Sequence, residues 1–365
     1  MTETVLEQIE REGREYAAAR KELTLIVGLT RNGTRDVRAF RSPDARYAPL
    51  PDEETLYEIG SVSKVYTTAL LSVLVSRGVL ALDDTIASFF PDLELKPEIA
   101  EITVFDLATH SSGLDGNGKV LARLVDEAVA SGDFANYTYY ERYGKEHLEE
   151  EIREAELARP RGSGWEYSRT GLSMLGHILE VAAGEPYEIL LKRHICEPLG
   201  LKDTTYTLTE EQDRRLVRGY YEDGTPSNVW LWGIMLPQGG IRSTMDDMLT
   251  FAEANLADDD SQLTADLRRA RETEFEWPDG YALPGTDVSP PRFRQALGWR
   301  NTTLPAGTVS EHAGATFSYQ AVLGVHQESR SALVALTSSA TNLEDLMTFP
   351  GFCLRLLDRA IESAG

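Results

Sequence analysis

A serine and a lysine three residues apart, in the run Ser61-Val62-Ser63-Lys64, have the residue types needed for nucleophilic chemistry. A serine hydroxyl is a weak nucleophile until a base removes its proton. A lysine amine serves as that base only where desolvation or a neighbouring cation lowers its pKa. Residues three apart share one face of a helix, so the Lys64 amine is able to reach the Ser61 hydroxyl. A helix N-cap and a surface lysine would show the same pattern, so the motif alone does not decide.

Two further segments carry candidates for the same site. Tyr167 lies in the run GWEYSR at 164–169, just before an expected helix. A phenol has a reference pKa of about 10, so it acts as a base at neutral pH only beside cations. His312 and Gly314 precede an expected pair of strands, where a glycine allows a ligand to approach the backbone closely. Each residue alone also fits a structural role, so the combination and its order carry the weight.

The elements expected around these residues are strands near both ends of the chain and helices between them. Strands are expected at 23–29, 36–40, 55–59, 319–326 and 332–337. Helices are expected at 3–20, 61–76, 104–110, 118–131, 140–159, 171–183, 187–197, 245–255 and 343–361. This order predicts an α/β domain of residues 1–80 and 291–365, split by an inserted all-α domain of residues 81–290. A site in the cleft between two such domains is the expected place for a ligand.

The three motifs in this order resemble those of the penicillin-recognising serine hydrolases. These are the class C β-lactamases, D-alanyl-D-alanine carboxypeptidases and β-lactamase-like family VIII carboxylesterases. Further similar segments are YEIGSVSKVYT at 57–67, ITVFDLATHSSGL at 102–114, YSRTGLSMLGHILE at 167–180, PLGLKDTTY at 198–206, GGIRSTMDDMLTF at 239–251 and HAGATFSYQAVLGV at 312–325. The resemblance implies a serine β-lactamase-like fold, in which helices from both termini flank an antiparallel sheet and a helical domain is inserted.

The resemblance also implies a role for each site residue. Ser61 is expected to attack an acyl carbonyl and form an acyl-enzyme, while Lys64 and Tyr167 share the work of the base. The backbone N–H groups of Ser61 and Ala315 are expected to form the oxyanion hole. Two cations beside Tyr167 would favour its phenolate form. His312, Gly314 and Arg169 are the expected substrate-binding residues.

Two positions depart from the family pattern. Arg169 occupies a position where the family often has Asn, and a guanidinium donates hydrogen bonds but cannot accept them. Facing the site, Arg169 would lower the Lys64 pKa and offer a fork for a carboxylate; facing outward, it would be an ordinary surface residue. His312 replaces the Lys of penicillin-binding members, and esterase-type members often have His there, which favours esters over β-lactams.

Aromatic residues in two irregular stretches are candidates for an apolar acyl pocket. They are Trp230, Trp232 and the run Tyr137-Thr138-Tyr139-Tyr140. Core packing is the more common fate of such residues.

Composition narrows the choice of partners. The 365-residue chain has a net charge of −23, which repels nucleic-acid phosphates and anionic lipid, so neither is an expected partner. The two cysteines, Cys196 and Cys353, are too few for a disulfide framework or a thiolate zinc cluster and are expected to be small buried residues. We expect no metal or organic cofactor, because the His and carboxylate residues show no ligand spacing. The charged N-terminal segment lacks the apolar core of a secretory signal, so a cytoplasmic location is expected.

The sequence therefore predicts a serine hydrolase that acts through an acyl-enzyme on small esters or similarly activated acyl groups. The same residues would also suit a β-lactamase, a D-amino-acid peptidase or amidase, or an acyltransferase. A non-catalytic acyl-binding or scaffold protein on this fold is the alternative from another class, and Arg169 is the feature that favours it. The natural substrate and the oligomeric state stay open.

Overall fold

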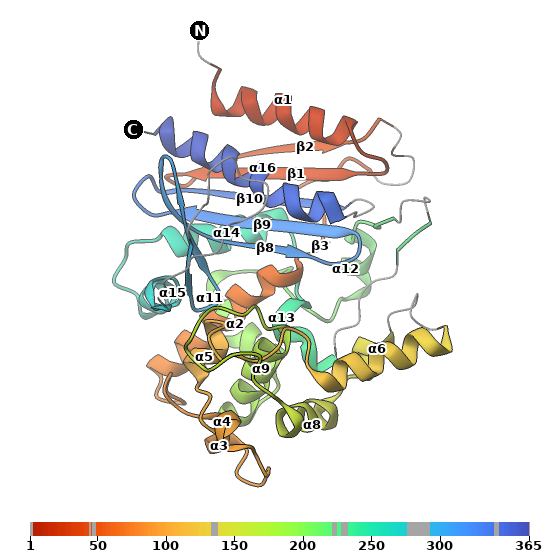
Figure 1. Ribbon diagram of the computed structural model, residues 1–365. Helices are drawn as coiled ribbons and strands as arrows, with labels where there is room; N and C mark the ends of the chain where they lie inside the picture. The colour runs from red at the N-terminus through yellow and green to blue at the C-terminus, as the bar shows by residue number, and fades with distance from the viewer. Residues whose placement is uncertain are drawn as a thin grey trace.

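The structure is a computed structural model, and it describes residues 3–43, 45, 49–132, 138–220, 225–227, 233–275, 293–338 and 343–364. Within these residues, the centre of the fold is an antiparallel sheet of eight strands (Figure 1). In spatial order the strands are β2 (Thr34–Arg41), β1 (Thr24–Arg31), β10 (Ser331–Ser338), β9 (Tyr319–His326), β8 (Gly307–Ala315), β7 (Arg300–Leu304), β6 (Phe293–Ala296) and β5 (Glu274–Phe275). The N-terminal and C-terminal parts of the chain thus pair side by side, because β1 runs next to β10.

Helices cover both faces of the sheet. Helices α1 (Val5–Ala18) and α16 (Leu343–Glu362) pack on one face (Figure 1), and α14 (Met245–Leu256) packs on the other against β1, β9 and β10. All residues of β9 and β10 are therefore buried, which explains their near-continuous apolar sequence. The expected fold class, with helices of both termini flanking an antiparallel sheet, is confirmed.

Helix α1 shows how local sequence and packing agree. Thr4 caps its first turn, since the side chain accepts from the Glu7 N–H and the Glu7 carboxylate accepts from the Thr4 N–H. Its buried residues recur at helical spacing and include Ile9, Gly13 and Tyr16. Gly13 lies directly against the Phe40 ring, where a Cβ atom would be 2.4 Å from a ring carbon. The helix therefore sits close to β2.

The remaining helices lie on the side of the sheet away from α1 and α16 (Figure 1). They are α2 (Ser63–Ser76), α3 (Ile86–Phe89), α4 (Pro97–Ala100), α5 (Val104–Ala108), α6 (Lys119–Ser131), α7 (Thr138–Arg142), α8 (Lys145–Glu154), α9 (Arg169–Ala183), α10 (Tyr187–Leu191), α11 (Glu197–Leu199), α12 (Glu210–Arg215), α13 (Leu236–Gly239) and α15 (Gln262–Glu272). A small second sheet, β3 (Tyr57–Glu58) with β4 (Arg242–Ser243), lies between them and the large sheet. This arrangement brings segments from all parts of the chain to the start of α2.

Two expected helices differ from the structure. The single helix expected over 140–159 is wrong, because α7 and α8 are separated at Gly144, whose backbone is extended. The helix expected over 187–197 is present, but its central part, Lys192–Cys196, is a π-helical turn, and α11 then ends at Gly200 in the left-handed conformation. The other expected helices lie within a few residues of their expected bounds, whereas α15 is a helix that the sequence patterns do not predict.

The sequence patterns do not predict β6, β7 and β8. In β8 the apolar alternation is interrupted by Glu311, which is completely buried. Its carboxylate accepts from the Arg300 guanidinium at 2.8 Å and from the Thr302 hydroxyl at 3.0 Å, both on the neighbouring β7. A buried charge is tolerated only when it is paired in this way, and that pairing is invisible in the sequence.

The expected division into domains stays a prediction. Helix α14 and strand β5 lie within the expected insert of residues 81–290, yet they pack against or pair with the large sheet. The boundary at 290 falls outside the described residues. Cys196 and Cys353 are both buried and unpaired, as expected.

Candidate active site

Ser61 lies where two backbone segments, the turn after β3 and the end of β8, pack closely against each other. Strand β3 leads into a 3-10 turn, Gly60–Val62, and Gly60 has a positive φ of 51°. A Cβ atom on Gly60 would be 2.6 Å from the Ala315 N, and one on Gly314 would be 2.7 Å from the Ser61 N. Both glycines are therefore required for β8 to approach the nucleophile segment. The approach brings together the backbone of Ser61 and Ala315, the two residues expected to form the oxyanion hole.

Lys64 is completely buried one helical turn after Ser61. Its Nζ lies 3.0 Å from the Ser61 Oγ, and it donates to Gln238, at 2.6 Å to the backbone O and 3.1 Å to the side-chain Oε1. Desolvation, reinforced by the positive charges of Arg169 and Arg300, holds the pKa of this amine well below its usual range. Lys64 therefore meets the condition under which a lysine acts as a base.

Tyr167 reaches the same hydroxyl from the other side. Its OH donates to the Ser61 Oγ at 2.7 Å, and Ser61 and Tyr167 both keep partial exposure to solvent. The expectation that cations favour the phenolate is wrong for this resting state. Desolvation raises the Tyr167 pKa and outweighs the lowering effects of the Ser61 hydrogen bond, Arg300 and Arg169. Tyr167 is therefore a neutral phenol that can give a proton away.

His312 lies on β8 and is buried. Its Nδ1 donates to the Ala313 carbonyl oxygen at 2.7 Å, which leaves Nε2 as the acceptor of the ring. Desolvation, reinforced by the charge of Arg300, holds the His312 pKa well below its usual range, so the ring is neutral. A neutral imidazole is a poor anchor for a carboxylate.

Arg169 is the first residue of α9 and is half-buried. Its guanidinium donates to the Asn117 side-chain oxygen. Its charge lowers the pKa of Lys64, and it also acts on Tyr167 and Tyr140. The charge of Arg169 therefore acts on Lys64 and Tyr167, although its hydrogen bond goes to Asn117 in a neighbouring loop.

Three residues near Ser61, Lys64 and Tyr167 are not among the site residues expected from the sequence. Gln238 is buried in α13 and holds the Lys64 amine. Arg300 is a half-buried cation whose charge acts on Lys64, Tyr167 and His312, although it lies on a strand that the sequence did not predict. A signal for Gln238 exists in retrospect, since it immediately precedes two glycines, but only the fold brings it to α2.

His110 is the third of these residues. It is buried, has an unusual positive φ of 58°, and packs its ring 4.6 Å from the Tyr167 ring. Its Nδ1 accepts from the Ser168 N–H at 3.1 Å, so it fixes the backbone that follows Tyr167. Desolvation, reinforced by the charge of Arg300, lowers the pKa of His110, so this imidazole is also neutral. Backbone strain at such a position is typical of functional sites.

Only some of the aromatic residues expected to line an acyl pocket lie among the described residues. Trp230, Trp232 and Tyr137 lie outside the described residues, as does the side chain of Thr138. Tyr139 and Tyr140 are buried in the core around α7.

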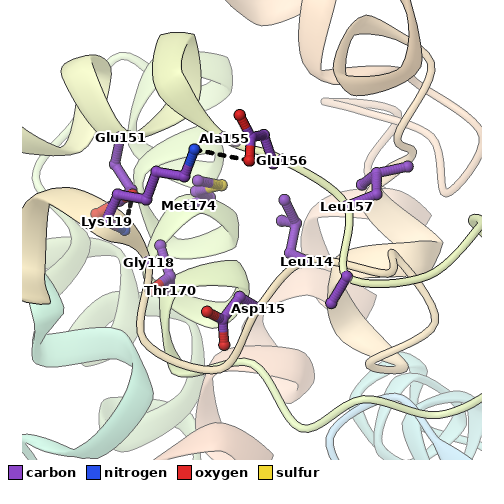
Figure 2. Close-up of a pocket in the computed structure, with 11 residues that line it drawn as sticks. Leu114, Asp115, Gly118, Lys119, Glu151, Ala155, Glu156, Leu157, Thr170 and Met174 are labelled. Atoms are coloured by element: carbon purple, nitrogen blue, oxygen red, sulfur yellow. Dashed lines mark hydrogen bonds and ion pairs between the residues drawn. The ribbon is translucent and has the colours of Figure 1, made fainter.

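A separate cavity of about 180 Å³ lies beside the start of α9 (Figure 2). Leu114, Leu157 and Met174 give it apolar walls, and the Lys119 amine pairs with Glu156 at 2.7 Å on its polar side. Ser61, Lys64 and Tyr167 do not line it. The cavity is therefore distinct from the candidate active site around Ser61.

Among the described residues, no group of three or more His, Cys, Asp or Glu side chains is arranged to hold a metal ion. In the same part of the chain, none of the helices is both long enough and apolar enough to cross a membrane. The expected cytoplasmic location stays a prediction.

A family model described as Beta-lactamase matches residues 6–348. The chain belongs to the Beta-lactamase family. Among related proteins, the D-alanyl-D-alanine-carboxypeptidase/endopeptidase AmpH of Escherichia coli is 28% identical over 254 residues, 68% of this chain and 61% of AmpH. Esterase EstB of Burkholderia gladioli is 32% identical over 204 residues, 51% of this chain and 47% of EstB. The chain thus matches less than two thirds of the length of either relative.

Solved structures confirm the fold. A β-lactamase/D-alanine carboxypeptidase from Pseudomonas syringae matches 99% of this chain and 98% of its own, with a TM-score of 0.78 and 17% identity. A protein of the same description from Yersinia pestis, complexed with citrate, covers 98% of both chains with a TM-score of 0.77 and 21% identity. At these identities the likeness shows the β-lactamase fold alone. The family as a whole supports a serine hydrolase, and the relatives differ in the acyl substrates that their names describe.

Proposed function

We propose that this protein is a carboxylesterase-like serine hydrolase that forms an acyl-enzyme at Ser61. The observation that carries the proposal is the position of the Ser61 Oγ, 3.0 Å from the Lys64 amine and 2.7 Å from the Tyr167 hydroxyl. These distances suit proton transfer in both directions. The low pKa of Lys64 and the raised pKa of Tyr167 give the two neighbours different roles at neutral pH.

In the acylation step Lys64 acts as the base. The neutral amine takes the Ser61 proton while the Oγ attacks the ester carbonyl carbon, which yields an ammonium and a tetrahedral oxyanion. The N–H groups of Ser61 and Ala315 are the proposed donors to that oxyanion. Such a donor typically contributes about 3 kcal/mol to the stability of the transition state.

Tyr167 acts as the proton donor in the second half of this step. When the tetrahedral intermediate collapses, the C–O bond to the alcohol breaks and the leaving oxygen takes the phenol proton. The ammonium of Lys64 then returns the serine proton to Tyr167. Water then enters in place of the alcohol and loses a proton to the same pair as its oxygen bonds to the acyl carbon. The bond from this carbon to the Ser61 Oγ breaks, the Oγ takes the proton from the pair, and the acid is released.

An ester fits the site better than an anionic β-lactam because of the charges around the nucleophile. His312 is neutral, and the half-buried cation Arg300 is already paired with the buried Glu311. Arg169 is the described cation that remains available near the site, and it is hydrogen-bonded to Asn117. A substrate carboxylate needs a cation as its partner, whereas a neutral acyl group does not. The site therefore suits a neutral acyl group better.

The test is hydrolysis of short p-nitrophenyl esters by the wild type and the Ser61→Ala variant. We expect turnover in the wild type and a loss of about 10⁴-fold or more in kcat in the variant. Ser72→Ala is the matched control, since Ser72 is buried on the same helix and its Oγ has no hydrogen-bond partner among the described residues. Turnover that survives in Ser61→Ala would remove the nucleophile assignment.

Hydrolysis of β-lactams or D-amino-acid peptides is the second candidate, because AmpH is described as a D-alanyl-D-alanine-carboxypeptidase/endopeptidase and the matching family model is described as Beta-lactamase. A chromogenic cephalosporin and a D-alanyl-D-alanine peptide, assayed beside the esters, rank these substrates by kcat/KM. An added alcohol or amine that diverts the acyl group from water would identify an acyltransferase. An adduct that persists in mass spectra would instead identify a non-catalytic acyl-binding protein.

A further inference from the structure

Gln238 makes two contacts with Lys64 from a segment distant in sequence. The backbone O of Gln238 accepts from the Nζ at 2.6 Å, and its side-chain Oε1 accepts at 3.1 Å. In this arrangement the Nζ donates to both oxygens, so the side-chain atom that faces Lys64 is the amide oxygen and the amide nitrogen Nε2 is the other end of the group. The orientation of the Gln238 amide is thereby fixed.

These two acceptors determine the direction of the lone pair on a neutral amine. A neutral Lys64 has two N–H bonds, and the two Gln238 oxygens take both of them. The lone pair is then left for the third neighbour, the Ser61 Oγ at 3.0 Å. The same arrangement therefore presents the amine to Ser61 as an acceptor, as a general base requires.

The other half of the Gln238 side chain lacks a partner. Gln238 is 1% exposed, and its Nε2 has no hydrogen-bond partner among the described residues. A buried donor without an acceptor costs about 1–3 kcal/mol, so this group calls for an acceptor that the described residues do not supply. Ser61 Oγ and Gln238 Oε1 are bonded to the same nitrogen, which keeps them within about 6 Å of each other.

The segment that carries Gln238 is firmly held. The Pro237 carbonyl accepts from the Thr67 hydroxyl of α2 at 2.6 Å. On the other side Pro237 lies against α9 at Gly176, where a Cβ atom would be 2.1 Å from the proline ring. Short α13 is thus clamped between two helices, so the Gln238 amide is preorganised rather than free to follow a substrate.

We infer that Gln238 has two functions in the reaction proposed above: its two oxygens position the Lys64 amine toward Ser61, and its Nε2 donates to the acyl group of the substrate. The acceptor on the substrate is a carbonyl or similar polar oxygen within a few bonds of the scissile carbonyl. Acyl groups that carry such an oxygen are the preferred substrates. This inference rests on the proposed function.

Two esters of equal chain length test the donor function. The p-nitrophenyl esters of N-acetylglycine and of pentanoic acid differ in the presence of an amide in the acyl chain. Each kcat/KM is divided by the hydroxide-catalysed rate of the same ester, which removes the difference in intrinsic reactivity. We expect the wild type to prefer the N-acetylglycine ester and Gln238→Met to lower this preference about tenfold, the value of one hydrogen bond.

A second variant separates the two functions. Gln238→Glu keeps an acceptor for Lys64 but has no amide donor, so it should lose the preference to the same extent as Gln238→Met. Its negative charge favours the ammonium form of Lys64, so the acidic limb of kcat/KM should move to higher pH. Gln238→Met should lower kcat for both esters, because the amine is less well directed. Gln212→Met is the control, since Gln212 is a buried glutamine bonded to Thr209 and Asp203.

Three outcomes would overturn the inference. A preference unchanged in both variants would mean that Nε2 does not contact the acyl group. A kcat for pentanoate within about twofold of wild type in Gln238→Met, or an unmoved acidic limb in Gln238→Glu, would mean that Gln238 does not position Lys64. Loss of preference in Gln212→Met would assign the effect to the fold in general. If wild type and Ser61→Ala hydrolyse both esters equally, the proposed function itself fails, which is a different result.

Discussion

Gly314→Ala tests whether the approach of β8 to the nucleophile is required for catalysis. The added Cβ would lie 2.0 Å from the Ile59 carbonyl oxygen, 2.7 Å from the Ser61 N and 2.8 Å from the Val62 N. All three neighbours are backbone atoms, so no flexible side chain can give way. An ordinary contact is at least 3.4 Å, so the two segments must separate by about 1 Å or more.

The magnitude follows from the proposed oxyanion hole. Its two donors lie on the two backbone segments that Gly314→Ala pushes apart. One is the N–H of Ser61, and the other is the N–H of Ala315. Loss of one such donor lowers kcat by about 10²–10³-fold, or about 3–4 kcal/mol. Overpacking also lowers the free energy of unfolding by about 1–3 kcal/mol, which a protein of this size survives.

The assay is kcat/KM for p-nitrophenyl butyrate, with far-UV circular dichroism and a thermal melt to verify folding. Gly324→Ala is the matched control, since Gly324 lies on β9 and the tight contact of its added Cβ is with the end of the flexible Leu357 side chain, at 2.8 Å, while Glu311 and Leu354 lie at ordinary contact distances. We expect the control to stay within about threefold of wild type. A folded Gly314→Ala variant with activity in that same range would refute the reasoning. An equal loss of activity in Gly324→Ala would show that a general disturbance of the sheet causes the loss, and not the separation of β8 from the Ser61 segment.

The remaining predictions concern charge, proton transfer and stability. Arg169→Gln removes a cation that lowers the Lys64 pKa, so that pKa rises and the acidic limb of the kcat/KM profile moves to higher pH; an unmoved limb would separate Arg169 from the reactive group. Tyr167→Phe removes the proton donor, so kcat should fall further for an alkyl ester than for a p-nitrophenyl ester, whose leaving group needs no proton; equal losses would contradict the assigned role. Glu151→Ala leaves three N–H groups at the start of α6 without their acceptor, two of them in buried hydrogen bonds, so urea denaturation should show a loss of about 3 kcal/mol. Glu150→Ala breaks an exposed ion pair and should cost about 0–1 kcal/mol, and a similar loss in both variants would refute the difference.

The strands and helices near the ends of the chain were predictable because their patterns are local. Strands β9 and β10 show long apolar runs between turn residues, and α2 follows directly from a strand and a glycine. Strand β8 escaped prediction because its pattern is broken by Glu311, whose charge is neutralised by a residue on another strand. The sequence contains both members of that pair but not their proximity.

The protonation states at the site also depended on the fold. Sequence reasoning placed cations beside Tyr167 and expected a phenolate, but burial raises the pKa of the phenol by more than the cations lower it. For Lys64 the two effects act in the same direction, since desolvation and neighbouring cations both disfavour an ammonium. The expectation was therefore met for the amine and reversed for the phenol.

The sequence by itself determined the pairing of the proposed nucleophile with its proposed base, because Ser61 and Lys64 lie on one turn of a helix and their distance needs no tertiary contact. It also determined the order of motifs from which the family and its fold were expected. Only the tertiary structure brought Tyr167 to the other side of the hydroxyl and Gln238 to the amine, from positions 106 and 174 residues away from their partners. Contacts over such separations, and the desolvation that sets the pKa values, depend on how the whole chain packs.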